Sequence, residues 1–390
     1  MTKKTTEKSS NILEAELIAK YFGFTKKSPE TVNKEDEKVT AGICREKNYL
    51  GENLFPISEI FAGLRRYRED KEKEMVEPEL IYYEGSAHGK HPKHRKRNGE
   101  ELLNMHIINV DSSIAEATLI HATKVILQEH NVKNIIVKLN DIGDKDSLNS
   151  YYKEVTSYYR KNINDLNNHC RQLFKESVHA LVTRGKNQCT QIHDAAPKPM
   201  DFLDEDARKR FSEVLEFLET LGIPYEVDHG ILGDPNYSTH TVFEIIDTET
   251  SKTVAMGSRY DSLARKCGLK RDIPSVGVMI NLPNPKNISS KMMKKFDKTK
   301  FFFLQIGYLA KLKSLAIIEE FRKENIPVLH KIFRDRLSAQ ISSAKKAGSD
   351  FFIIMGQKEA LDDELIVRDK DSRSQKIVAR SELRNYLKSI

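Results

Sequence analysis

Long apolar runs and paired cysteines are both missing from this 390-residue sequence. No apolar stretch approaches the roughly 20 residues that a membrane-spanning helix requires. The polar start MTKKTTEKSS is not followed by the apolar segment of a secretion signal. Cys44, Cys170, Cys189 and Cys267 form no C-x-x-C pair, and no Cys/His cluster has zinc-site spacing. Because isolated thiols are typical of a reducing compartment, we expect a cytoplasmic protein with no membrane span and no metal site.

A strong excess of one charge is also missing. The 64 basic and 57 acidic residues leave a net charge of +7. This modest excess is compatible with an RNA partner, but many proteins without such a partner share it. The chain is 39% apolar and 31% charged, which is typical of a globular protein. Its length predicts two or three domains with a core that needs neither disulfides nor a structural metal.

Residues 1–10 are predicted to be a disordered tail, and residues 11–283 one large domain of mixed helices and strands. Ser113 and Glu116 have the spacing of a capping box, which predicts the start of a long amphipathic helix. Residues from about 145 to 200 are polar and helical, and we interpret them as an insertion. The later stretches IPYEVD, STHTVFEIID and KTVAMG resemble strands, and we expect them to form an antiparallel sheet.

Residues 284–299 are rich in Pro, Asn, Ser and Lys and are predicted to be a linker. The hydrophobic period changes beyond it. Continuous apolar stretches, FFFLQIG, IPVLH and FFIIMG, alternate with amphipathic helices over residues 300–390. This pattern predicts a compact α/β domain with a buried parallel sheet.

Three motifs in fixed order carry a resemblance to a known family. THTVFEIID, MGSRYDSLARKCGL and IPSVGVMINLP resemble the histidyl-tRNA synthetase run Y-T-G-T-V-F-E, G-G-R-Y-D-G-L and P-A-V-G-F-A-I-G-L-E-R. Downstream, MGQKEALDDELIVRDKDSRSQKIV resembles the anticodon-binding domain of this group of synthetases. The resemblance implies an α+β fold: a class II synthetase-like antiparallel sheet with flanking helices, and a C-terminal α/β anticodon-binding-like domain. It also implies, by analogy, a homodimer.

Several charged positions of the family's reaction differ in this sequence. Activation joins an amino-acid carboxylate to the α-phosphate of ATP, and the negative charge that develops there needs fixed cations, for which arginine is well suited. Gly233 stands where the family's histidine-binding loop has arginine, and Ser238 replaces its second tyrosine. Asn284 stands where the third motif has arginine, and SAHGKHPKHRKRNGEELLNMHI occupies the place of the second motif. Three of the family's positive charges are therefore missing.

Six residues match the family's amino-acid and ATP pocket, and the resemblance implies a vestigial pocket at these positions. They are Tyr237, Thr239, Glu244, Arg259, Tyr260 and Asp261. The alternative for the R-Y-D run is a structural role, in which Arg259 to Asp261 only end a strand and order a turn. The alternative for Glu244 is a sheet residue that faces water.

Two groups of basic residues are candidate RNA contacts, since clustered cations gain affinity by releasing counterions from phosphates. The groups are Lys90, Lys93, Arg95, Lys96 and Arg97 in the loop, and Arg334, Arg336 and Arg368 in the C-terminal domain. The alternative in both places is a solvated surface. His88, His91 and His94 lie every third residue in the same loop, but the cations between them would repel a metal ion.

These features lead to three hypotheses. The favoured one is a synthetase paralogue that has lost amino-acid activation and binds tRNA or another RNA, or regulates an enzyme through a pocket for a histidine-like ligand. The second is a divergent but active histidine–tRNA ligase, which would use ATP and Mg²⁺. The third is a protein-binding scaffold that contacts no RNA. Histidine-dependent ATP–pyrophosphate exchange distinguishes the second from the others.

Overall fold

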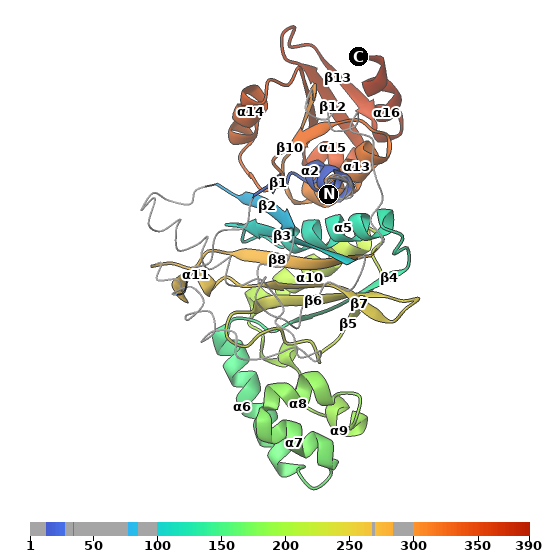
Figure 1. The fold of residues 1–390 in the computed structure, drawn as a ribbon. Helices are drawn as coiled ribbons and strands as arrows, with labels where there is room; N and C mark the ends of the chain where they lie inside the picture. Colours follow the sequence, from blue (N-terminus) through green and yellow to red (C-terminus); the bar gives the residue numbers. More distant parts are fainter. Residues whose placement is uncertain (1–12, 28–33, 35–76, 85–99, 267–269, 284–298) are drawn as a thin grey trace.

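The computed structural model describes residues 13–27, 34, 77–84, 100–266, 270–283 and 299–390. In this part of the chain, a body built on one large sheet lies between a helical projection and a smaller C-terminal domain (Figure 1). The architecture is mixed α+β with a separate C-terminal α/β domain, as the sequence predicts.

The large sheet contains eight strands among the described residues, in the order β1-β2-β3-β8-β7-β6-β4-β5. Their bounds are β1 Thr25–Lys26, β2 Glu79–Glu84, β3 Glu100–Ile108, β4 Ile135–Asp141, β5 Tyr225–Val227, β6 Thr239–Asp247, β7 Lys252–Arg259 and β8 Ser275–Pro283. The six inner strands pair antiparallel, which confirms the predicted antiparallel sheet. The prediction is wrong for β5, which pairs in parallel with β4.

Helices cover one face of this sheet. Helix α5 (Ile114–Glu129) packs on β3 and β8, α10 (Glu205–Thr220) packs on α5 and β6, and α2 (Leu13–Tyr21) lies against α5. Alternate strand residues such as Met105, Ile245 and Val278 enter the core beneath them. Because successive side chains point to opposite faces of a strand, the intervening residues face the other side of the sheet.

The predicted capping box at the start of α5 is wrong. Ser113 has helical dihedral angles (φ −54°, ψ −23°), and its side chain makes no capping hydrogen bond. Its hydroxyl donates instead to Glu213 of α10 at 2.6 Å. Glu116, the other half of the expected box, pairs with Arg259. Both side chains are therefore committed to tertiary contacts.

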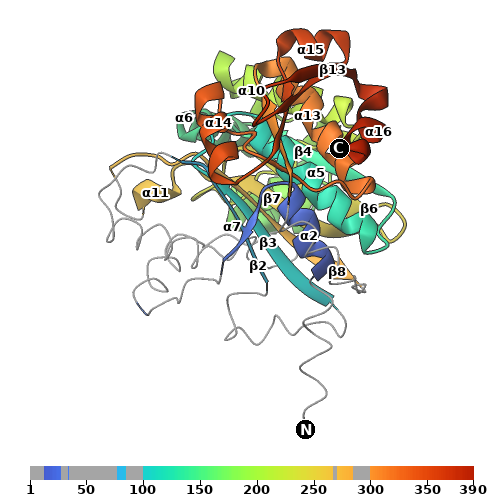
Figure 2. The same ribbon diagram turned by 90° about the horizontal axis from the view of Figure 1, so that it is seen from above.

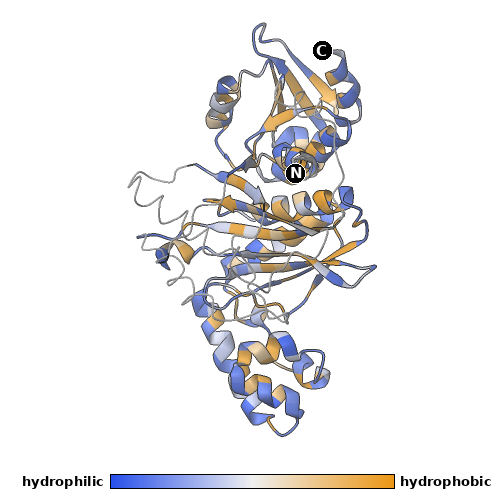
Figure 3. Ribbon diagram, in the orientation of Figure 1, coloured by the Kyte–Doolittle hydropathy of each residue, from blue (hydrophilic) through white to orange (hydrophobic). Residues whose placement is uncertain are grey.

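The helical projection follows β4. It comprises α6 Lys145–Lys161, α7 Asn168–Glu176, α8 Val178–Gly185, α9 Thr190–Asp194 and the 3₁₀ turn η1 Pro199–Phe202. These helices carry both hydrophobic and hydrophilic residues (Figure 3) and enclose a small core that includes Tyr151, Tyr159 and Leu181. Cys170 is buried in that core, whereas Cys189 is partly exposed; Cys44 and Cys267 lie outside the described residues.

The C-terminal domain contains a second sheet in the order β10-β9-β11-β12-β13. Its strands are β9 Phe301–Gln305, β10 Val328–His330, β11 Phe351–Met355, β12 Glu364–Asp369 and β13 Gln375–Ala379, and its helices are α13 Tyr308–Lys323, α14 Leu337–Lys346, α15 Gln357–Asp362 and α16 Arg380–Ser389. The three apolar strands β9, β10 and β11 pair in parallel, which confirms the prediction, and β12 and β13 add antiparallel.

The C-terminal domain sits on the helical layer of the body. Helix α13 packs against α2, α5 and α10, and one hydrophobic core runs through all four helices. Viewed from above, the C-terminal domain overlies α5 and α10 (Figure 2). Among the residues that the structure describes, no helix combines the length and apolarity needed to cross a membrane.

Candidate functional site

The large sheet separates the predicted pocket residues. Arg259 extends toward α5 on the helix-covered side, where it pairs with Glu116. Tyr260 and Glu244 face the opposite side of the sheet, where Tyr260 contacts His106 and Glu244 lies beside the helical projection. The motif therefore does not bring its residues into a single pocket.

The guanidinium of Arg259 is fully buried and occupied by protein groups. Its Nε and Nη2 donate to the two carboxylate oxygens of Glu116 at 2.6 and 2.9 Å. Its Nη1 donates to the Val110 carbonyl at 3.0 Å and to Asp261 at 3.2 Å. Burial lowers the pKa of Arg259, but Glu116 and Asp261 raise it by more, so the charge is retained. A two-pronged carboxylate contact of this kind fixes geometry and leaves little capacity for a ligand.

Asp261 and Thr239 continue this network. Asp261 accepts a hydrogen bond from the Ser275 amide at 2.8 Å, and its own amide donates to the Thr239 hydroxyl at 3.2 Å. Burial raises the pKa of Asp261, although Arg259 opposes the shift. The network thereby ties together α5, the start of β6, the end of β7 and the start of β8.

On the opposite face, aromatic and imidazole rings cover the centre of the sheet. The Tyr260 hydroxyl lies 2.9 Å from Nδ1 of His106, and the Tyr83 hydroxyl lies 3.3 Å from its Nε2. His106 is fully buried, and burial lowers its pKa to about 3, so the ring is neutral. His106 is paired in register with Gly277, where a Cβ atom would lie 2.3 Å from Nδ1. The missing side chain at Gly277 makes room for the ring.

Sequence reasoning missed His106. Two signals could have found it. It lies between the core residues Met105 and Ile107, so alternation places its side chain on the face of the sheet opposite α5. A glycine, Gly277, also stands opposite it on β8.

A small cavity of about 40 Å³ lies beside Glu244, between α8, the segment 230–233 and strands β6 and β7. Burial raises the pKa of Glu244 to about 7, and Lys186 opposes that rise. Lys186 also lines the cavity, but its ammonium pairs with Asp228 at 2.6 Å. His179, another lining residue, has a pKa lowered to about 4 by burial. Among the described lining residues, Lys186 is therefore the cation at neutral pH, and it is already paired.

The loop that resembles the histidine-binding loop is closed by its own hydrogen bonds. The Ser238 hydroxyl accepts from the Asp234 amide at 2.9 Å and from the Ser258 hydroxyl at 2.8 Å. Tyr237, in the same loop, is buried. Gly233 has a φ of +63°, and a Cβ there would lie 2.6 Å from the Ser238 hydroxyl. A larger residue at position 233 would be strained in this arrangement.

The structure distributes the predicted RNA contacts unevenly. Arg336 is exposed at the start of α14, and Arg368 is partly exposed on β12. Arg334 pairs with Glu77 of the body, and within its own domain it donates to the Ala339 carbonyl and the Ser343 hydroxyl of α14. The basic loop residues lie outside the described residues, as do His88, His91 and His94. Within the described part of the chain, no group of three His, Cys, Asp or Glu side chains could hold a metal ion.

Comparisons with known proteins cover most of the chain. The model of a family described as histidyl-tRNA synthetase matches residues 82–284, more than half of the chain, and that of an anticodon binding domain matches residues 309–390. A histidine–tRNA ligase of Pediococcus pentosaceus is 27% identical over 334 residues, covering 81% of this chain and 76% of the relative. One from Wolbachia pipientis of Culex pipiens is 26% identical over 314 residues, covering 79% and 76%.

A solved structure supports the fold. The apo histidyl-tRNA synthetase of S. aureus superposes with a TM-score of 0.53 at 16% identity, covering 100% of this chain and 97% of that one. At this identity the likeness concerns the arrangement of the elements, and it agrees with the body and C-terminal domain described above.

Proposed function

This chain belongs to the histidyl-tRNA synthetase family, and from that premise we propose that it has lost amino-acid activation and acts as a tRNA- or RNA-binding or regulatory protein. We further propose that it works as a homodimer in the cytoplasm, by analogy with the class II body.

One observation carries the loss of activation: Arg259, which matches the family's motif, and Lys186, which lines the pocket, are both already paired. Arg259 is held by Glu116 on the far side of the sheet, and Lys186 is held by Asp228. Gly233, at the position of the family's loop arginine, has a left-handed backbone packed against Ser238. A developing phosphate charge would meet no available fixed cation among these positions.

The described pocket does not fit ATP. Three phosphates require several cations or backbone donors directed at one place, whereas the cavity beside Glu244 is small and its acid is poised to be protonated near neutral pH. A buried carboxyl group with a pKa near 7 is better suited to an amine or an imidazole, which can share its proton. A histidine-like ligand at Glu244 is therefore part of the regulatory form of the proposal.

RNA binding is supported by the match to an anticodon binding domain over residues 309–390 and by the exposed Arg336 at the start of α14. The test is retention of tRNA by the full chain on filters over a range of salt concentrations. We expect Arg336→Ala and Arg368→Ala to weaken tRNA binding. Each change should also reduce the slope of log K against log salt concentration by the amount expected for roughly one phosphate contact. Lys252→Ala, an exposed lysine on β7 of the body, is the control. Absence of tRNA retention would favour the scaffold hypothesis.

Amino-acid activation is tested by histidine-dependent ATP–pyrophosphate exchange. We expect no exchange above a sample lacking the protein. If exchange is found, Tyr260→Phe decides whether it belongs to this chain, because this change removes the hydroxyl group beside His106 and keeps the ring. Arg259→Ala is unsuitable for this purpose, since it would leave Glu116 buried without its partner. Exchange that is reduced by Tyr260→Phe would refute the proposed loss of activation.

The second candidate is a divergent histidine–tRNA ligase. It is favoured by the two relatives above, which carry that name and align over about three quarters of their length. In that case basic residues of the loop, such as Arg95 and Arg97, would have to supply the missing cations, and ATP and Mg²⁺ would be required.

A further inference from the structure

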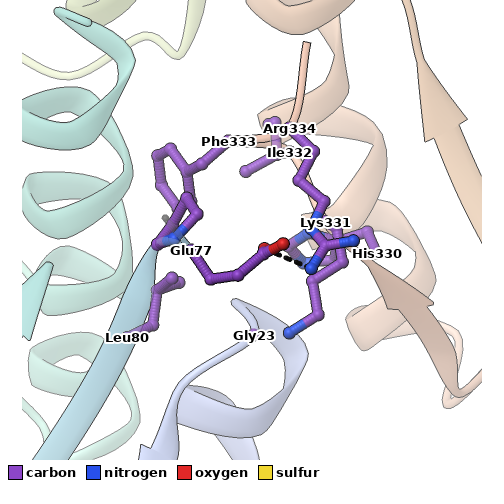
Figure 4. Close-up of a pocket in the computed structure, with 9 residues that line it drawn as sticks. Gly23, Glu77, Leu80, His330, Lys331, Ile332, Phe333 and Arg334 are labelled. Atoms are coloured by element: carbon purple, nitrogen blue, oxygen red, sulfur yellow. Dashed lines mark hydrogen bonds and ion pairs between the residues drawn. The ribbon is translucent and has the colours of Figure 1, made fainter. Parts of the chain in front are cut away.

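A second cavity, of about 140 Å³, lies where the body meets the C-terminal domain (Figure 4). The body contributes Gly23, which follows α2, and Glu77, Pro78 and Leu80 at the start of β2. The C-terminal domain contributes His330, the last residue of β10, and residues 331–334, which follow it. In another protein, an apolar cavity of about 150 Å³ accommodates a benzene ring, so this space is large enough for a single ring.

The charged side chains that line this cavity carry a net positive charge. Arg334 is held in place by the Ala339 carbonyl at 3.2 Å and the Ser343 hydroxyl at 2.8 Å, and it pairs with Glu77 across the cavity (Figure 4). Lys331 has no ion-pair partner among the residues that the structure describes. Lys331 is exposed at the mouth of the cavity; partial desolvation of its ammonium group and the neighbouring Arg334 lower its pKa, and Glu77 opposes the shift. An anion placed here would form an ion pair with Lys331 and would compete with Glu77 for Arg334.

A buried imidazole adds a polar group to the wall. His330 is 5% exposed, and its Nε2 lies 2.8 Å from the Tyr21 carbonyl. Since a carbonyl can only accept, Nε2 carries the proton and the other nitrogen of the neutral ring, Nδ1, is an acceptor. Within the described part of the chain, Nδ1 has no hydrogen-bond partner. The remaining wall is largely apolar, with Leu80, Ile332 and Phe333.

We propose that this interdomain cavity binds a small organic anion, a carboxylate or a phosphate on an apolar body. The anionic group lies at Lys331 and Arg334 and competes with Glu77, while the apolar body packs against Leu80, Ile332 and Phe333. Because the two sides of the cavity belong to different domains, the ligand stabilises their contact. This site is separate from the pocket beside Glu244 and does not depend on the proposed function.

The test is calorimetric titration of the full chain with benzoate and phenyl phosphate, which separate the carboxylate from the phosphate source, and with neutral benzamide. We expect saturable binding of at least one anion with a Kd below about 10 mM, and binding of benzamide at least about ten-fold weaker. Lys331→Met should weaken binding of the anion at least about ten-fold. Glu77→Gln should tighten binding of the anion, because this change removes the carboxylate that competes for Arg334.

The matched control is Lys370→Met, an exposed lysine at the end of β12 in the same domain. This change should leave the affinity for the anion unaltered. The proposal is overturned if neither anion saturates, if benzamide binds as well as benzoate, or if Lys331→Met has no more effect than Lys370→Met. Circular dichroism of each variant verifies that the fold is intact, so loss of binding is read only from folded protein.

Discussion

Mild acid should destabilise this protein, because several histidines are buried in the neutral form. Burial lowers the pKa of His106 and His121 to about 3, and that of His179, His240 and His330 to about 4. In the unfolded chain the same rings titrate near 6.5. Below that pH the unfolded state therefore binds more protons than the folded state, and the free energy of unfolding decreases as the pH falls. This contribution to stability is complete above about pH 6.5 and is lost progressively toward pH 4.

Two buried acids oppose this trend. Burial raises the pKa of Asp141 and of Glu244 to about 7, so the folded state takes up protons there that the unfolded chain binds only near pH 4. Five protons favouring the unfolded state less two favouring the folded state leave a net difference of three. At 1.36 kcal/mol per proton and pH unit, the slope is about 4 kcal/mol per pH unit, or about 6 kcal/mol between pH 6.5 and 5. That loss is comparable with a typical total stability of about 5–15 kcal/mol.

The assay is urea unfolding followed by circular dichroism between pH 7.5 and 5.5. His121→Leu is the informative variant, because neither ring nitrogen has a hydrogen-bond partner among the described residues and the ring packs edge-on against Phe22. It should reduce the slope by about 1.4 kcal/mol per pH unit. His169→Gln, at an exposed position on α7, is the control and should change nothing. A stability that stays constant from pH 7 to 5.5, or an unchanged slope in His121→Leu, would refute the reasoning.

Three further predictions concern the core and the thiols. Arg259→Ala should lower the free energy of unfolding by about 3–5 kcal/mol in urea titrations. The Glu116→Ala/Arg259→Ala double variant should lose less stability than the sum of the two single changes. Additive losses would contradict an energetic coupling between the two side chains. Gly277→Ala should cost about 1–3 kcal/mol through its contact with His106, measured in the same way; an unchanged midpoint would count against that packing. Burial raises the pKa of the Cys170 thiol to about 12, so a thiol reagent at pH 8 should modify it only on unfolding; rapid labelling of native protein, located by mass spectrometry, would disprove this.

Much of the fold followed from sequence because long strands and helices carry periodic apolar patterns. β9 and β11 are continuous apolar runs, and the structure pairs them in parallel at the centre of their sheet. The capping box failed for a tertiary reason. Ser113 and Glu116 have the right local spacing, but Glu213 and Arg259 offer them stronger partners in the folded chain. Local spacing cannot reveal partners about 100 or more residues away.

The direction of β5 and the position of Arg259 could not be read from sequence for similar reasons. β5 follows α10, which crosses over the sheet and returns the chain in the direction of β4. The pairing of β6 with β7 shifts register between Thr239 and Val242. Such a shift breaks the simple alternation that would assign a motif residue to one face of the sheet. The R-Y-D run therefore identified the family without revealing that its arginine faces away from Glu244.

The shared core of α2, α5, α10 and α13 makes the C-terminal domain mechanically continuous with the body. A ligand or RNA that orders α13 acts directly on α5, and α5 holds Glu116 and thereby the Arg259 network. Free energy of binding at one end of the molecule can then alter stability at the other without any moving hinge. This packed connection could transmit binding free energy between the domains whether or not the chain catalyses a reaction.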